Sequence, residues 1–249
     1  MGFINYLING ISLGSVYAII ALGYTMVYGI AKMLNFAHGD VIMIGSYVVF
    51  VTVSTMGFPP LAGILVAVLA CTLLGMTIER IAYKPLRGAS PLAVLITAIG
   101  VSYLLQNVAL LIFGSNARQF TSVVNVPSLK LAGGALSISG VTLVTIITCI
   151  VIMVALTTFI NKTRVGQAML AVSEDTGAAT LMGINVNFVA MIVFLLSGAA
   201  AGLAGCFYGM KYSVFPSMGA IANKGFVAAT IGGLGSLTGA VISGLLLAV

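Results

Sequence analysis

Charged side chains are scarce in this sequence of 249 residues. Lys, Arg, Asp and Glu together account for 6% of it, whereas hydrophobic residues account for 61%. A soluble domain of this length cannot bury so much apolar surface, so a lipid bilayer must be the solvent for most of the chain. The net charge of +6 is spread over loops without forming a basic run. This distribution disfavours nucleic acid as a partner.

Side chains with catalytic chemistry are equally few. The sequence holds one histidine, four carboxylates and no Walker A phosphate loop. We therefore expect a protein that is not an enzyme, that has no catalytic residue, cofactor or metal site, and that does not bind ATP by that motif. Cys71, Cys149 and Cys206 lie far apart in apolar segments, without the spacing of a metal site or a disulfide. They are interpreted as small buried hydrophobic residues.

About seven apolar segments approach the roughly 20 residues that a membrane-spanning helix needs. All are expected to be helical, since an open strand in lipid would leave backbone groups without hydrogen bonds. No basic segment precedes the first of them, so we expect it to remain as a helix and not to be cleaved as a signal peptide. The chain is predicted to be an all-α polytopic membrane helix bundle, with seven to eight membrane segments in a single transmembrane domain over residues 1–249. The apolar segments are residues 3–28, 41–56, 61–78, 92–113, 141–160, 186–210 and 226–249.

Two cationic loops indicate the orientation of the bundle. Residues 79–90 carry three Lys or Arg side chains, and residues 161–185 carry two. Two predicted spans separate these loops, so both can face the cytoplasm under the positive-inside rule. Residues 114–140 and 211–224 then face outward. The break at residues 32–40 can be a re-entrant turn, which leaves the number of spans before the first cationic loop open.

The longest stretch that is not suited to lipid is residues 162–185, between two strongly apolar segments. Ser173 can cap a short helix, two carboxylates follow it in the first turn, and Gly183 is well placed to end the helix. We predict an amphipathic helix over residues 174–182 that needs a partner surface, because so short a helix is marginal alone in water. The alternative is a solvated loop that only joins two spans. The residues concerned are Ser173, Glu174, Asp175, Ala178, Ala179, Leu181, Met182 and Gly183.

Small residues recur at helical spacing in three of the predicted helices. Such stripes let helix backbones approach closely where no hydrophobic force drives helices together. They predict a tightly packed bundle, and packing against another membrane subunit is the interpretation that we favour. The glycines are Gly10, Gly14, Gly198, Gly202, Gly205, Gly209, Gly235 and Gly239.

Polar residues within the apolar segments mark either a translocation pathway or contacts between helices, because polar groups at membrane depth must find partners or water. Both interpretations remain open. The residues are Asn5, Asn9, Ser12, Asn35, Thr97, Ser102, Gln106 and Asn107. No Lys, Arg or carboxylate lies in the middle of a predicted span, while His38 and Asp40 lie at the edge of a break. This disfavours an ion-coupled carrier, which usually needs an ionisable group near the midplane.

Several blocks of the sequence resemble the high-affinity branched-chain amino acid permeases of ABC importers. The resemblance lies in NGISLGSVYAIIALGYTMVYGI followed by LNFAHGDVIMIGSY, in IERIAYKPLRG and LITAIGVSYLLQN, and in SEDTGAATLMGIN and FVAATIGGLGSLTGAVISGLLL. It extends over nearly the whole chain and is weakest in residues 114–140. Relatives often carry basic residues where this chain has Met169 and Leu170, which puts in doubt a charge contact at that place.

The resemblance implies a permease subunit of the bacterial plasma (inner) membrane. It would pair with a second permease, as a hetero- or homodimer, with two ABC ATPase subunits on the cytoplasmic side and a solute-binding protein outside. Residues 174–182 would be the coupling helix that sits in a groove of the ATPase. The substrate would be leucine, isoleucine and valine, with urea or short amides as the alternative. An ion-coupled carrier and a purely structural membrane subunit are the other hypotheses.

The last apolar segment ends at Val249 without a residue typical of a membrane interface. Members of the family that the chain resembles continue into a further apolar segment and a polar tail. We therefore expect the intact gene product to be longer by roughly one span, which the intact mass of the natural protein would test.

Overall fold

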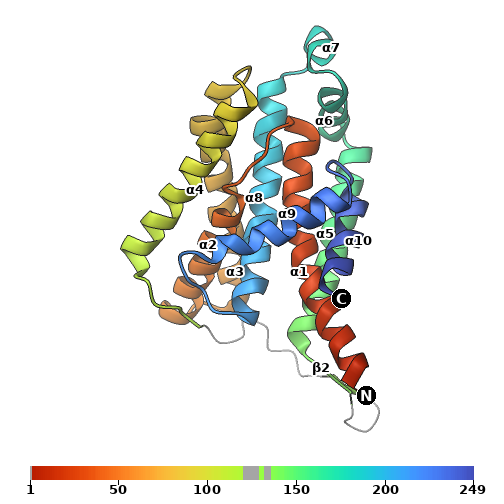
Figure 1. Cartoon of the computed structure of the whole chain (residues 1–249). Coiled ribbons are helices and arrows are strands. Elements are labelled where there is room, and N and C mark those ends of the chain that lie inside the picture. Colours follow the sequence, from red (N-terminus) through yellow and green to blue (C-terminus); the bar gives the residue numbers. More distant parts are fainter. Residues whose placement is uncertain (1, 120–128, 132–135) are drawn as a thin grey trace.

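The computed structural model describes residues 2–119, 129–131 and 136–249, and the side chains of residues 6–119 and 138–249. Ten α-helices account for most of this part of the chain, as the sequence predicted for an all-α fold (Figure 1). They are α1 (Gly2–Ala31), α2 (His38–Val49), α3 (Pro60–Ile78), α4 (Pro91–Phe113), α5 (Gly140–Lys162), α6 (Arg164–Glu174), α7 (Thr176–Leu181), α8 (Val186–Lys211), α9 (Ala222–Ile231) and α10 (Leu237–Ala248).

Shorter elements join or extend these helices. Two π-helical turns, η1 (Phe50–Thr55) and η2 (Glu79–Tyr83), extend α2 and α3, and the 3-10 turns η3 (Lys84–Leu86) and η5 (Met218–Ile221) precede α4 and α9. The strands β1 (Leu129–Leu131) and β2 (Leu136–Ile138) form a short antiparallel pair. In the described part of the chain, six helical segments are long and apolar enough to cross a membrane. These are Tyr6–Ala31, His38–Thr55, Pro60–Leu86, Pro91–Phe113, Gly140–Lys162 and Val186–Lys211.

The seventh predicted segment, residues 226–249, is not one continuous helix. It is divided into α9 and the 12-residue α10, and Gly233 and Gly235 between them have φ values of +90° and +108°. These angles are accessible to glycine at little cost, so the glycines allow the chain to reverse. Figure 1 shows α9 crossing the bundle in front of α8 and α1, and α10 turning back alongside α1. These glycines thus divide the apolar segment into two helices.

The chain between α1 and α2 re-enters the bundle. Lys32, with φ of +54°, ends α1, and α2 begins at His38, of which only 1% is exposed. The imidazole of His38 packs edge-on against Tyr24, with ring centroids 4.8 Å apart, and its Nδ1 lies 3.3 Å from the hydroxyl of Ser197. Because Ser197 lies near the middle of α8, α2 starts deep within the bundle. Since α2 and η1 then continue as a segment long enough to cross the membrane, the break at residues 32–40 is the interrupted first part of a span and not a re-entrant turn.

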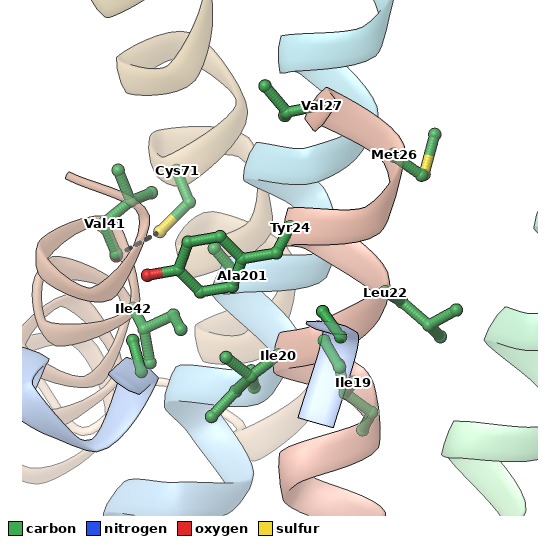
Figure 2. Packing of buried hydrophobic residues seen from close by; sticks show 14 of the residues in the cluster. Ile19, Ile20, Leu22, Tyr24, Met26, Val27, Val41, Ile42, Cys71 and Ala201 are labelled. Atoms are coloured by element: carbon green, nitrogen blue, oxygen red, sulfur yellow. Dashed lines mark hydrogen bonds between the residues drawn. The ribbon is translucent and has the colours of Figure 1, made fainter. Parts of the chain in front are cut away.

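Helix α1 runs through the core of the bundle. Ile19, Ile20 and Leu22 are completely buried, and Figure 2 shows this part of α1 packed among residues of α2, α3 and α8. The thiol of Cys71 lies 3.4 Å from the carbonyl oxygen of Val41. All three cysteines are buried and free, as the sequence predicted.

The glycine stripes bring helices of this one chain together. A Cβ atom at Gly202 of α8 would lie 2.9 Å from the Cα of Val68 in α3, and a Cβ at Gly205 would lie 2.9 Å from the backbone nitrogen of Ser46 in α2. Helix α8 therefore contacts α2 and α3 almost backbone to backbone. Gly198 meets the backbone of Cys71 in the same way. Gly209 is also buried in α8.

The same close packing joins α1 to the last helical hairpin. A Cβ at Gly14 would lie 2.8 Å from the Cα of Leu245, and a Cβ at Gly10 would lie 2.8 Å from the carbonyl oxygen of Ala248. Gly235 packs against Gly29, and Gly239 packs against Gly232. From the sequence, we interpreted these stripes as a contact with another membrane subunit. That interpretation is wrong for the contacts that the structure shows, because these glycines pack against backbone atoms of the same chain.

The two cationic loops lie at the same end of the bundle, as the positive-inside rule predicted. Arg87 forms an ion pair with Glu79 and donates a hydrogen bond to the side chain of Asn187, which ties the loop after α3 to the start of α8. Helices α6 and α7 extend from this end (Figure 1). At the opposite end, the backbones of Arg118 and Val214 exchange hydrogen bonds of 2.8 and 2.7 Å.

Candidate coupling and translocation sites

Helix α7 begins later than the sequence analysis predicted. Asp175 caps it, because its Oδ1 accepts a hydrogen bond of 2.9 Å from the backbone N–H of Ala178. Ser173 and Glu174 belong instead to α6, where the hydroxyl of Ser173 donates to the carbonyl of Leu170 at 2.7 Å. The predicted range of residues 174–182 and the capping role of Ser173 are therefore wrong. The cause is Thr163, which caps a helix that continues through residue 174.

The predicted end of this helix is confirmed. Gly183 has φ of +82°, and its N–H donates to the carbonyl of Thr180 at 3.0 Å. The N–H of Ile184 reaches back to the carbonyl of Ala179, also at 3.0 Å. A residue with a left-handed conformation at this position is the common way to end a helix, and glycine adopts it with the least steric cost.

Helix α7 presents two large apolar side chains to its surroundings. Leu181 is 90% exposed and Met182 is 83% exposed, whereas Ala179 is only 3% exposed and faces the chain itself. Ala178, the other small residue in the prediction, is exposed. Figure 1 shows α7 as the part of the molecule that extends farthest from the bundle at this end. Leu181 and Met182 therefore form the exposed apolar surface of this projecting segment.

Two of the polar residues of α4 meet a buried carboxylate. The side-chain amide of Gln106 donates hydrogen bonds to Oδ1 of Asp40 at 2.9 Å and to the hydroxyl of Ser102 at 3.2 Å. Asp40 lies in the first turn of α2 and is only 2% exposed. In the sequence, Asp40 lies at the edge of a break, and it is not among the predicted site residues. The signal that could have identified Asp40 as a site residue is its position directly after the sequence NFAHG.

The other two polar residues of α4 do not take part in this contact. Thr97 is partly buried, and Asn107 is exposed and donates to the carbonyl of Tyr103 at 2.7 Å. Asn107 and Gln106 line a cavity of about 370 Å³ between α4 and the segment that follows α8. This outer cavity lies toward the end of the bundle opposite α7. Its lining residues are Tyr103, Gln106, Asn107, Leu110, Ser115, Phe215, Pro216 and Ser217.

The remaining predicted pathway residues lie in different parts of the structure. Ser12 is buried and accepts a hydrogen bond of 2.8 Å from the ammonium group of Lys211. Asn35 is buried and accepts one of 3.0 Å from the hydroxyl of Tyr83. Asn9 is exposed, and the side chain of Asn5 lies outside the described part of the structure. The bonds of Ser12 and Asn35 join separate segments of the chain, so for these two residues the structure shows helix contacts.

Cysteine substitution tests whether the outer cavity is open to water. We expect cysteines at Gln106 and Asn107 to react with small aqueous thiol reagents, and the rate to change when substrate or ATP is added to the assembled transporter. A cysteine at Ala98, which is fully buried on the same helix, is the matched control and should stay unreactive. The three native cysteines are buried and should contribute little background. Equal inertness at all three positions in every state would contradict a water-filled cavity.

Comparison with known proteins identifies the family. Residues 6–249 match the family described as branched-chain amino acid transport system / permease component. The chain is 39% identical to the high-affinity branched-chain amino acid transport system permease protein BraD of Pseudomonas aeruginosa. It is 41% identical to the permease protein LivH of Salmonella typhimurium and 40% identical to LivH of Escherichia coli. Each alignment covers 99% of this chain and 84% of the relative.

No solved structure matches the chain. The family match extends over nearly all of the sequence, and the structure has the helices that a multi-pass membrane protein requires. The chain therefore belongs to the family of branched-chain amino acid transport permeases, and it is a transport subunit of the inner membrane and not an enzyme.

Proposed function

We propose that this chain is the membrane permease subunit of an ATP-driven importer, and that it translocates leucine, isoleucine and valine delivered by an external solute-binding protein. The names of the relatives supply the substrate class. The structural observation that carries the proposal is α7, a capped helix that exposes Leu181 and Met182 at the same end as the cationic loops. A subunit without a phosphate loop of its own needs a contact surface for a separate ATPase, because ATP hydrolysis in that ATPase must drive its conformational change.

The proposed partner of α7 is an ABC ATPase subunit with an apolar groove. Two such ATPases would act on a pair of permeases, one of which is this chain. Helix α6 provides the mechanical connection, because Met169 and Val172 are buried and α6 packs against α1, α5 and α8. A displacement of α7 would therefore be transmitted to the bundle through packed side chains, as in the helix shifts of other allosteric proteins.

The proposed pathway passes the polar face of α4. Ser102 and Gln106 are directed toward α2, and the outer cavity beside them has both polar and apolar walls. A substrate released by the binding protein would enter from this side. Broken helices near the centre of a bundle often mark substrate sites in transporters. Here the interrupted start of α2 and the 3-10 turn η5 are two such places, and they meet where Gly39 packs against the backbone of Gly219.

Competition of uptake separates the proposed substrate from the alternative. The permease is reconstituted in vesicles with its ATPase, its partner permease and its binding protein, and the uptake of labelled leucine is measured. Isoleucine and valine are expected to compete with leucine, and urea and acetamide are expected not to compete. Uptake of urea or acetamide without uptake of leucine would contradict the proposal and favour a permease for urea or short amides.

A further inference from the structure

We propose that Asp40 and Gln106 form the binding site for the ammonium group of the substrate, at the inner wall of the outer cavity. This inference rests on the proposed function, because an α-amino acid is the substrate class that carries such a group next to an apolar side chain. The site joins α2 to α4, two helices that are far apart in the sequence. The family match and the names of the relatives assign no role to either residue.

The carboxyl group of Asp40 has no cationic partner among the side chains that the structure describes. Asp40 is 2% exposed and lies in a segment long and apolar enough to span the membrane. Among the residues whose side chains the structure describes, Glu79 and Arg87 form the one ion pair, and no Lys or Arg pairs with Asp40. The nearby His38 directs its Nδ1 to Ser197. Carboxylates within membrane segments are costly, and where they occur they usually pair with a cation or mark a substrate or ion pathway.

The carboxyl group of Asp40 is hydrogen-bonded to a residue in the wall of the outer cavity. Gln106 lines the outer cavity and donates its amide N–H to Asp40 at 2.9 Å, so the side chain of Gln106 connects the carboxylate to the cavity wall. In the structure, the Nε2 atom of Gln106 faces Oδ1 of Asp40. The amide oxygen of Gln106 is then available to accept an N–H from an ammonium group. A rotation of the Gln106 side chain would expose the carboxylate itself.

The outer cavity is lined by both apolar and polar side chains. Leu110, Phe215 and Pro216 form apolar walls that suit a branched aliphatic side chain, and Asn107 supplies amide N–H groups that suit a carboxylate. The volume of about 370 Å³ lies within the range of small-molecule sites. A metal ion fits less well, since the described residues contain no group of three His, Cys, Asp or Glu side chains that could hold one. The site therefore suits an organic cation with an apolar tail.

A purely structural role for Asp40 makes a different prediction. Asp40 lies in the first turn of α2 and connects that helix to α4, and an asparagine has nearly the same shape and retains an acceptor for Gln106. The substitution Asp40→Asn therefore removes the charge and leaves the contact. It preserves function if the role is structural, and it removes binding if the charge holds the ammonium group.

The experiment measures binding to the permease assembly without the binding protein, whose own selectivity would otherwise mask the result. Ser217→Cys provides a reporter, because Ser217 is exposed at the wall of the outer cavity and the native cysteines are buried. The rate of its reaction with an aqueous thiol reagent is measured with leucine, with 3-methylbutylamine, which lacks the carboxylate, and with 4-methylpentanoate, which lacks the ammonium group. Leucine and 3-methylbutylamine are expected to slow the reaction, and 4-methylpentanoate is expected not to.

In the Asp40→Asn background, the concentration of leucine needed for protection is expected to rise at least about tenfold, and leucine uptake by the full transporter is expected to fall with it. Glu79→Gln neutralises the other buried carboxylate and is expected to leave the protection unchanged. Protection by 4-methylpentanoate as strong as that by leucine would overturn the inference without any substitution at Asp40. Full protection and uptake in Asp40→Asn would also overturn it. Absence of leucine uptake in the unsubstituted transporter would instead contradict the proposed function.

Discussion

Replacing Leu181 with glutamate is expected to abolish ATP-driven uptake by the assembled transporter while the permease itself remains folded. Leu181 is 90% exposed, so its side chain contributes little to the stability of this chain. In the proposed complex the same side chain enters an apolar groove of the ATPase. A charge there would be buried without a partner, at a cost of about 2 kcal/mol or more for a central interface residue. This corresponds to a loss of roughly 30-fold in the affinity of the ATPase for the permease.

The measurements are uptake into vesicles, co-purification of the ATPase and the thermal unfolding of the isolated permease. Leu181→Met keeps an apolar side chain and should retain uptake. Gln167→Glu adds an acidic group at an exposed position of α6 and should also retain it. Ala179 is less suitable for this test than the sequence suggested, because it is buried and a large residue there would disturb α7 itself. Normal uptake and ATPase recruitment by Leu181→Glu would show that α7 is only a linker.

Replacing Gly202 with leucine is expected to separate α3 from α8 and to destabilise the bundle. A Cβ at this position would lie 2.9 Å from the Cα of Val68 and 3.0 Å from the carbonyl oxygen of Ala67. Both neighbours are backbone atoms, so the clash can be relieved only by moving a helix. Overpacking of this kind costs about 1–3 kcal/mol or more. The expected result is a lower midpoint of thermal unfolding in detergent, or little folded protein.

Gly100 offers a matched control for this substitution. It lies on the exposed part of α4, and nothing is found within 4 Å of a Cβ built at that position. Gly100→Leu should therefore leave the unfolding temperature of the isolated permease nearly unchanged. Equal unfolding temperatures for Gly100→Leu and Gly202→Leu would contradict the close packing of α3 on α8.

The spans were the most predictable part of the fold, because hydrophobicity and length alone decide which segments can cross a bilayer. The break before α2 was also signalled, since Lys32, His38 and Asp40 interrupt an apolar sequence. The partners of the glycine stripes were not predictable. Spacing shows that one face of a helix is small, but it does not show which helix will pack against that face. A second subunit was therefore expected for contacts that lie within this chain.

The coupling segment shows the same limit at the level of single residues. Gly183 was correctly placed at the end of α7, because a left-handed backbone strongly favours glycine. The start of α7 was misplaced because Ser173 and Asp175 are both good capping residues, and the choice between them depends on how far α6 extends. The contact between Gln106 and Asp40 joins residues 66 positions apart. It depends on the packing of α4 against α2, which no local pattern reveals.

The central claim is that this chain carries branched-chain amino acids across the membrane with energy from ATP that is hydrolysed by another subunit. Its most direct test is the accumulation of labelled leucine in vesicles that hold the complete transporter, with the binding protein on one side and ATP on the ATPase side. Accumulation is expected only when both are present, and it should stop when a non-hydrolysable ATP analogue replaces ATP. Accumulation driven by a sodium or proton gradient without ATP would contradict the claim.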